Sequence, residues 1–301
     1  MSWNLEDAGS QDGRVAIVTG ANAGLGLETA RALAESGCEV ILACRNADKA
    51  AAAREQIIRR QPGARLACMT LDLSRLVSVS DFAQKFKRRY QRLDLLINNA
   101  GIMMPPFALS EDGFESQLAT NYLGHFALTG RLLPRLLATS ESRVVSVSSL
   151  AHRWSPIRLE DPHFANGYDA RLAYGQSKLA CLMFAYELDR RLCDGGHRTL
   201  SVAAHPGVSV TNLADHFPLA NALFKTAARL VLQSAAAGAQ PLLYAALAAE
   251  VEGGDYCGPL WLNQWRGPPG KVGSNRRSKD PAVAAQLWSL SEQATGVAYL
   301  S

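Results

Sequence analysis

The stretch RVAIVTGANAGLG, residues 14–26, decides the fold. Its first half is a short apolar run with β-branched residues, which predicts a buried strand. Its second half places Gly20, Gly24 and Gly26 in a turn, and the helical pattern LETARALAES follows. Such a turn directs free backbone N–H groups and the positive end of the helix dipole at one point, where a phosphate can bind. The spacing is GxxxGxG rather than GxGxxG, and glycines can also serve only to turn the chain.

Strand and helix patterns alternate along the rest of the chain. Strands are predicted near 14–19, 39–43, 65–71, 93–97, 142–148, 198–204 and 256–262. Helices are predicted near 24–36, 46–60, 75–90, 112–138, 170–194, 220–249 and 281–294. This alternation indicates one α/β domain, residues 1–301, built on a doubly wound parallel sheet with helices on both faces. RGPPGKVGSN (266–275) is expected to be a loop that begins a flexible segment within a C-terminal extension, 263–301.

The composition excludes several classes of protein. Hydrophobic residues make up 48% and charged residues 19%, as in globular proteins with a sizeable core. The net charge is only +4 and the arginines are scattered, so no nucleic-acid partner is expected. The histidines and cysteines lack metal-ligand spacing, so no metal is expected. The polar first residues and the lack of a long apolar run predict reduced thiols, a cytoplasmic location and no membrane anchor.

Tyr174 and Lys178 lie four residues apart in YGQSK, within a helical pattern. That spacing places both side chains on one face of the helix. A lysine ammonium beside a tyrosine favours the phenolate form, and a positioned tyrosine can exchange a proton with a carbonyl or alcohol oxygen. The same spacing also occurs by chance in helices, where the tyrosine packs and the lysine is solvated.

Two further strands end in polar residues: LDLLINNAG (93–101) and SRVVSVSS (142–149). In order, TGANAGLG, NNAG, Ser149 and Tyr174-x-x-x-Lys178 resemble the short-chain dehydrogenase/reductase family, from about residue 13 to about residue 262. ACRN, NYLGHFALT, VSSLAH and HPGVSVTNL are similar to its branch of retinol dehydrogenases, which also resembles protochlorophyllide reductase. The resemblance implies a Rossmann-like sheet of about seven strands and hydride transfer between a nicotinamide cofactor and a carbonyl or alcohol.

The resemblance also assigns roles to residues. Ser149 is expected to hydrogen-bond the substrate oxygen, Tyr174 to exchange the proton, Lys178 to bind the nicotinamide ribose and Asn121 to keep a water in line with the lysine. The implied cofactor-binding set is Gly20, Asn22, Gly24, Leu25, Gly26, Arg45, Asp72, Leu73, Asn98, Ala100, Gly101, Tyr174, Lys178, Pro206, Gly207, Val208 and Thr211. Within that set, Asp72 could instead cap the following helix.

The end of the second strand bears on the type of cofactor. An acidic residue there would bind the ribose 2′-hydroxyl of NAD(H). This chain has Cys44 at that place and Arg45 next to it. A guanidinium suits a phosphate by charge and by geometry, which favours NADP(H) over NAD(H), although Arg45 could also be an ordinary surface residue.

Two segments are expected to cover the substrate, 152–172 and 213–235. The first contains Trp154, Ile157 and Phe164, and is either a packed surface loop or an apolar wall over the site. The second is amphipathic, so it could also lie on a membrane surface. A hydrophobic small-molecule carbonyl or alcohol is therefore the expected substrate. The alternative is a dinucleotide-binding sensor or scaffold without turnover, and assembly into a homodimer or homotetramer stays open.

Overall fold

The computed structural model describes residues 3–208 and 233–300. Thr211 and nearly all of the 213–235 segment therefore lie outside the described residues. The strands are β1 Val15–Thr19, β2 Glu39–Cys44, β3 Leu66–Thr70, β4 Leu95–Asn98, β5 Arg143–Val147, β6 Leu200–Ala204, β7 Tyr256–Trp261 and β8 Arg266–Lys271. They form a sheet of eight strands in the order β3-β2-β1-β4-β5-β6-β7-β8, in which only β8 is antiparallel to its neighbour. The predicted doubly wound parallel sheet is confirmed, with one strand more than expected.

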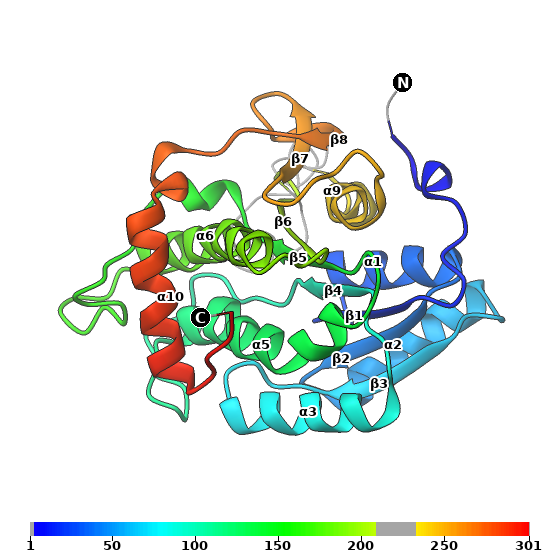
Figure 1. The fold of residues 1–301 in the computed structure, drawn as a ribbon, viewed down its shortest axis with the longest axis horizontal. Helices are drawn as coiled ribbons and strands as arrows, with labels where there is room; N and C mark the ends of the chain where they lie inside the picture. Colours follow the sequence, from blue (N-terminus) through cyan, green and yellow to red (C-terminus); the bar gives the residue numbers. More distant parts are fainter. Residues whose placement is uncertain (1–2, 209–232, 301) are drawn as a thin grey trace, which may run out of the picture.

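Helices cover both faces of this sheet (Figure 1). One layer comprises α1 Gly24–Glu35, α2 Ala47–Arg60 and α9 Ala235–Leu247. The other comprises α3 Leu76–Arg89, α5 Gly124–Leu137 and α6 Ala170–Asp194. Along β1, Val15 and Ile17 pack into the α3, α5 and α6 layer, whereas Ala16 and Val18 pack into the opposite layer. The continuous apolar run in the sequence reflects this burial on both faces.

Residues 266–271 form β8 and not the predicted loop. This strand pairs with β7 at the end of the sheet and sets Pro269 opposite Pro259. Proline is tolerated in an edge strand because the missing N–H does not interrupt a central ladder. The chain beyond β8 is not a flexible tail either. Helix α10, Pro281–Thr295, packs Trp288, which is 1% exposed, against Phe126 with ring centroids 5.0 Å apart.

The predicted helix at 112–138 begins later and is not continuous. A short helix, α4 Ser116–Leu118, starts where the buried Glu115 carboxylate accepts hydrogen bonds from the backbone N–H groups of Gln117 and Leu118. A π-helical turn, Ala119–Leu123, follows and leads into α5. Such turns widen the helix by one residue and are frequent at functional sites. The described part of the helix predicted at 220–249 is α9.

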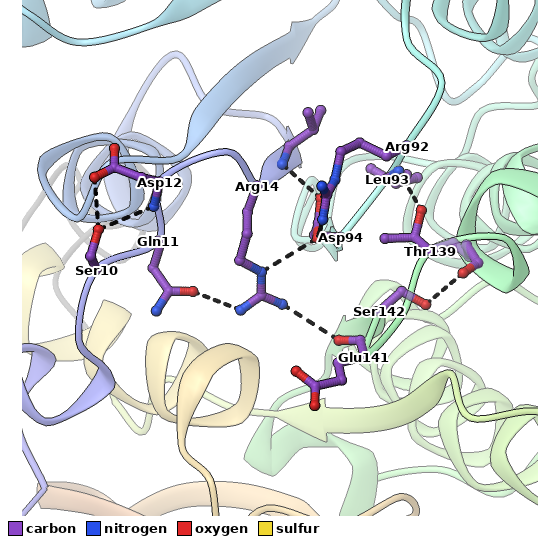
Figure 2. Close-up of polar contacts among 12 residues, drawn as sticks. Ser10, Gln11, Asp12, Arg14, Arg92, Leu93, Asp94, Thr139, Glu141 and Ser142 are labelled. Atoms are coloured by element: carbon purple, nitrogen blue, oxygen red, sulfur yellow. Dashed lines mark hydrogen bonds and ion pairs between the residues drawn. The ribbon is translucent and has the colours of Figure 1, made fainter.

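At the amino ends of the parallel strands, the amino edge of the sheet, polar side chains pair with one another and with the backbone (Figure 2). The carboxylate of Asp94, which is 1% exposed, accepts hydrogen bonds from the Val15 N–H at 2.8 Å and from Arg92 Nε at 2.9 Å. Arg14 Nε lies 3.5 Å from the same carboxylate. Nearby, the Thr139 hydroxyl accepts a bond from the Leu93 N–H at 3.1 Å. These contacts join the starts of β1 and β4.

Candidate active site

A cleft of about 360 Å³ lies at the carboxyl ends of the strands, next to the glycine turn after β1. The strand order reverses between β1 and β4, and ligands of open α/β sheets bind at such a point. Among the residues predicted to bind a cofactor, these line the cleft: Gly20, Asn22, Gly24, Leu25, Gly26, Arg45, Asp72, Leu73, Ala100 and Gly101. The structure therefore gathers most of that set in one place.

The glycines of the turn are required by geometry. Gly20 has φ +67°, and a Cβ there would lie 3.0 Å from the Cα of Ala100. A Cβ on Gly26 would lie 2.4 Å from the Gly20 carbonyl oxygen. The turn thus packs directly against the NNAG turn after β4. Ala23 precedes α1 and supplies no side-chain cap, so the first N–H groups of the helix stay available to an anion.

Thr19 and His125 hold the two turns together, and sequence reasoning missed both. The Thr19 hydroxyl accepts hydrogen bonds from the N–H groups of Asn99 and Ala100, each at 2.9 Å. His125 Nε2 lies 2.9 Å from that hydroxyl, and Nδ1 lies 2.9 Å from the Asn121 carbonyl oxygen. Burial lowers the pKa of His125 to about 4. The ring is therefore neutral at pH 7, with Nδ1–H donating to the carbonyl and Nε2 accepting from Thr19.

Asn98 does not line the cleft, contrary to the prediction. Its side chain is buried and donates from Nδ2 to the Thr129 hydroxyl at 3.0 Å. Its neighbour Asn99 lines the cleft instead and donates from Nδ2 to the Thr19 carbonyl at 2.7 Å. Successive residues of a strand point to opposite faces, so an Asn-Asn pair contributes one side chain to the interior and one to the site.

The far end of the cleft combines a neutral thiol with exposed cations. Burial raises the pKa of the Cys44 thiol to about 11. Arg45 is exposed and also lines the cleft, together with Lys49 from the first turn of α2. Lys49 was not predicted as a cofactor-binding residue. Its position four residues after Arg45, in the first turn of the predicted helix 46–60, is the signal that could have identified it. Asp72 lines this end too, and its Oδ1 accepts from the Ser74 N–H at 3.0 Å. Its carboxylate therefore supports the turn before α3 while it borders the cleft.

Ser149 and Tyr174 lie on elements that pack tightly together. Ser149 lies two residues beyond β5 and caps the start of a 3-10 helix, Leu150–Arg153, where its hydroxyl accepts a hydrogen bond from the Ala151 N–H at 3.2 Å. Gly175 of α6 lies against this helix, because a Cβ there would come within 3.0 Å of the Ala151 carbonyl oxygen. Tyr174, next to it, is half-buried. Ser148 is buried and donates to the Lys178 carbonyl at 2.7 Å, which commits it to a structural bond.

Lys178 and Asn121 meet beside the NNAG turn. The buried Lys178 Nζ donates to the Val147 carbonyl at 3.0 Å and lies 5.9 Å from the centre of the Tyr174 ring. Asn121 lies in the π-helical turn and bonds both the N–H and the carbonyl of Ile102, at 2.8 and 3.0 Å. A Cβ on Gly101 would lie 3.0 Å from Asn121 Oδ1 and 3.4 Å from Lys178 Nζ.

The β7–β8 hairpin supports the turn that contains Pro206, Gly207 and Val208. The Val208 N–H donates to the Trp265 carbonyl at 2.9 Å. Gln233 Nε2 donates to the Pro206 carbonyl at 3.1 Å. Gly207 has φ +70°, and a Cβ there would lie 2.3 Å from the Trp265 carbonyl oxygen. The turn that leads into the strand missed by the sequence prediction therefore helps to fix a predicted part of the site.

The 152–172 insert combines packed and open parts. Phe164 is buried, and Tyr168 donates to the Pro105 carbonyl at 3.0 Å. Gln117 Nε2 donates to the Tyr168 hydroxyl at 2.9 Å, which ties the insert to α4. Trp154 is 39% exposed, and its ring centre lies 6.2 Å from that of Tyr174. The insert is thus a packed loop that also presents an aromatic ring beside the predicted proton donor.

Disulfides, metal-ligand clusters and helices able to span a membrane are all absent from the described part of the chain. All of the cysteines are free. No group of histidine, cysteine or acidic side chains within residues 3–208 and 233–300 could hold a metal ion. Among the helices of these residues, none is long and apolar enough to cross a bilayer.

Comparison with known proteins places this site in a family. A model described as "short chain dehydrogenase" matches residues 14–218. The chain is 40% identical to retinol dehydrogenase 13 of Mus musculus over 294 residues, which cover 95% of this chain and 85% of the relative. An uncharacterized protein from Mycobacterium paratuberculosis has a crystal structure that superposes with a TM-score of 0.83 at 43% identity, covering 99% of this chain and 98% of the other.

A short chain dehydrogenase from Shigella flexneri complexed with NADP superposes with a TM-score of 0.64 at 26% identity, covering 81% of this chain and 96% of the other. The order of motifs, the sheet topology and these likenesses agree. The chain belongs to the short-chain dehydrogenase/reductase family of oxidoreductases, in its retinol-dehydrogenase-like branch.

Proposed function

We propose that this protein transfers a hydride between NADP(H) and a hydrophobic carbonyl or alcohol. One observation carries the proposal. The cleft extends from the exposed cations Arg45 and Lys49, past the glycine turn, to Gly101. There Asn121 and Lys178 come together on the side of Tyr174. A dinucleotide and a proton-transfer group would therefore meet at one edge of the sheet.

The residues present fit a dinucleotide phosphate. A Cβ at Gly20 or Gly26 would collide with neighbouring backbone atoms, so the turn needs both glycines to pack this closely. No side chain caps the start of α1, which leaves its first main-chain N–H groups available to a phosphate. Asp72 is the one acidic side chain among the described residues of the cleft. Arg45 and Lys49 at the far end would suit the extra phosphate of NADP(H). The NADP complex of the Shigella relative agrees with this choice.

The chemistry would follow from the chain's own side chains. When bound, NADPH supplies a hydride to the carbonyl carbon of the substrate. The hydroxyls of Ser149 and Tyr174 donate hydrogen bonds to the oxygen as negative charge grows on it, and Tyr174 transfers its proton. The Lys178 ammonium stabilises the resulting phenolate. Opposite unit charges about 6 Å apart attract by roughly 3 kcal/mol at an effective dielectric near 20. Alcohol oxidation reverses these proton movements.

An apolar substrate fits the residues around Tyr174. The exposed ring of Trp154 lies beside it, and the Arg171 guanidinium carbon lies 4.9 Å from the centre of that ring. Burial of apolar surface stabilises a bound substrate by about 25 cal/mol per Å². The similarity to a retinol dehydrogenase supports a hydrophobic alcohol or aldehyde. We also propose a cytoplasmic location, because a reducing compartment suits an oxidoreductase whose cysteines are all free.

The test is a panel of aldehydes and ketones with NADPH, read by the loss of NADPH absorbance. We expect turnover, tighter binding of NADPH than of NADH, and a kcat/KM that rises by up to several-fold per added methylene. Anionic carbonyl compounds should be poor substrates. NADPH binding without turnover across the panel would instead identify a dinucleotide-binding sensor or scaffold, and a flat size series would leave the hydrophobic substrate unsupported.

A further inference from the structure

Behind Ser149, two imidazoles and a tyrosine ring meet in the core. His152 and His205 are fully buried and Tyr256 is 3% exposed. The ring centre of Tyr256 lies 5.7 Å from that of His152, edge-on, and 5.0 Å from that of His205. His152 follows β5, His205 follows β6 and Tyr256 begins β7. The cluster therefore connects the strands that present Ser149 and the turn at Gly207.

His152 holds the backbone of Ser149 directly. Its N–H donates to the Ser149 carbonyl at 3.0 Å, and its Nδ1 lies 2.6 Å from the same oxygen. A carbonyl oxygen only accepts, so Nδ1 carries the hydrogen. Burial lowers the pKa of His152, which keeps the ring neutral. Two hydrogen bonds from one residue thus fix the peptide group that carries the Ser149 side chain.

His205 holds the neighbouring turn in a similar way. Its Nδ1 accepts a hydrogen bond from the Gly207 N–H at 3.2 Å. Burial lowers the pKa of His205 to about 3, so this ring is also neutral and carries its hydrogen on Nε2. Gly258 leaves room for it, because a Cβ there would lie 2.1 Å from that nitrogen. The two imidazoles pack on one tyrosine ring and hold the loops on either side of the site.

Stability alone does not explain a histidine at position 152. Within residues 3–208 and 233–300, its Nε2 has no hydrogen-bond partner. A buried polar atom without a partner costs free energy that an apolar side chain of similar volume would not cost. The hydrogen bond from Nδ1 to the Ser149 carbonyl is what the imidazole adds over a leucine.

We propose that His152 is a positioning residue for Ser149. Its Nδ1–H fixes the Ser149 carbonyl and thereby keeps the Ser149 hydroxyl directed at the substrate oxygen, while Tyr256 and His205 hold the imidazole ring in place. The side chain of His152 is fully buried, so it acts through Ser149 and does not touch the substrate. This inference rests on the proposed function, in which Ser149 binds the substrate oxygen.

The test compares three substitutions that differ in where an N–H donor lies. His152→Asn keeps an N–H near the position of Nδ1, His152→Gln moves it toward Nε2, and His152→Leu removes it. The measurements are kcat and KM for the best substrate of the panel and the Kd of NADPH. We expect His152→Leu and His152→Gln to lower kcat by about 10- to 100-fold, since small misplacements of a catalytic group have effects of this size. His152→Asn should stay within about threefold of wild type, and NADPH affinity should change by less than about twofold.

Tyr299→Phe is the matched control for a purely structural loss. It removes a buried hydrogen bond to the Phe126 carbonyl, 3.1 Å long, in the C-terminal region, and should lower the melting temperature without lowering kcat. Equal activity of the three His152 variants, or more than half of wild-type kcat in His152→Leu, would overturn the inference. If His152→Leu does not fold, the inference is tested by comparing the kcat of His152→Asn with that of His152→Gln. A wild-type protein without turnover removes the proposed function and this inference together, whereas an active wild type with an equally active His152→Leu removes only the inference.

Discussion

The amino ends and the carboxyl ends of the parallel strands, called here the amino edge and the carboxyl edge, use their polar groups in opposite ways. At the amino edge, the Asp94 carboxylate binds Val15, Arg14 and Arg92 within the protein (Figure 2). At the carboxyl edge, the glycine turn and the first N–H groups of α1 face a cleft. Polar groups that are paired internally stabilise the fold, whereas those that face a cleft are available to a ligand. Substitutions at the amino edge should therefore lower stability, and those at the carboxyl edge should lower function.

The largest effect should come from Tyr174→Phe. Turnover should fall by about 10²- to 10⁴-fold, because the hydroxyl that exchanges the proton is lost. The Kd of NADPH and the melting temperature should stay near wild type, since Tyr174 is half-buried and the substitution keeps its ring and the hydrogen bond from the Ser177 hydroxyl to its backbone carbonyl. Kinetics, cofactor titration and thermal unfolding check the three quantities. Retention of more than about a tenth of the activity would contradict the proton-transfer role.

Asp94→Ala should produce the converse result. It leaves the Val15 N–H unpaired and separates the start of β1 from Arg92. We expect the free energy of unfolding to fall by about 2–3 kcal/mol, measured by urea denaturation, with the affinity for NADPH unchanged.

Asp12→Ala is the matched control at the same edge. Asp12 is an exposed aspartate that contacts Ser10 (Figure 2). It also forms an ion pair with Arg65, and exposed ion pairs contribute little. Equal loss of stability in Asp12→Ala and Asp94→Ala would show that the buried network has no special role.

A smaller effect is expected at the cation end of the cleft. Arg45→Ala should weaken NADPH binding by about tenfold, because one charge-assisted contact contributes roughly 1.5 kcal/mol or more. NADH, which lacks the extra phosphate, should bind as before. Lys49→Ala should act in the same direction, and Arg45→Ala combined with Cys44→Asp should reverse the preference. Parallel titrations with both cofactors measure these changes, and an equal loss for NADH would assign Arg45 to another part of the cofactor.

Per pH unit, the smallest change is a slope in stability with pH. The buried His125 has its pKa lowered to about 4, whereas an unfolded histidine titrates near pH 6.5. Between these values the unfolded chain binds a proton that the folded chain does not. The free energy of unfolding should therefore fall as the pH drops from about 6.5 to 4, by up to about 1.4 kcal/mol per pH unit from this residue. His205 acts in the same sense.

His125→Gln isolates this contribution. It removes a titrating group, so its unfolding free energy should fall less steeply with decreasing pH, whatever its value at pH 7. Denaturation series at several pH values give both slopes. Parallel slopes for wild type and variant would contradict a neutral, buried His125.

The sequence predicted the parts of the molecule that depend on local pattern. The apolar run of β1 and the helical residues of α6 appear where their periodicity placed them. Strand β8 was missed because RGPPGK has the composition of a turn, and only its position at the sheet edge makes these residues a strand. The sequence alone does not show which strand lies at an edge of the sheet.

The site was predicted least well where the side chains of adjacent residues point in different directions. Asn98 and Asn99 are chemically identical, and only the register of β4 decides which of them faces the cleft. Thr19 and His125 are 106 positions apart and were missed because nothing local links them. Their contact depends on the packing of α5 against the end of β1, which belongs to the tertiary structure and has no local signal in the sequence.

The π-helical turn at Ala119–Leu123 has a consequence for insertions and deletions in this region. On its amino side, Gln117 contacts the insert, and on its carboxyl side, His125 contacts Thr19. A π-helical turn holds one residue more than an α-helical turn, so removing one residue from it would restore a regular α-helix with its two sides in nearly the same relative orientation. A further insertion or deletion between Gln117 and His125 would instead rotate one side relative to the other by about 100°, and only one of the two contacts would then survive. This segment can therefore lose the one extra residue of its π-helical turn, but a further change of its length would separate the insert from the cofactor cleft.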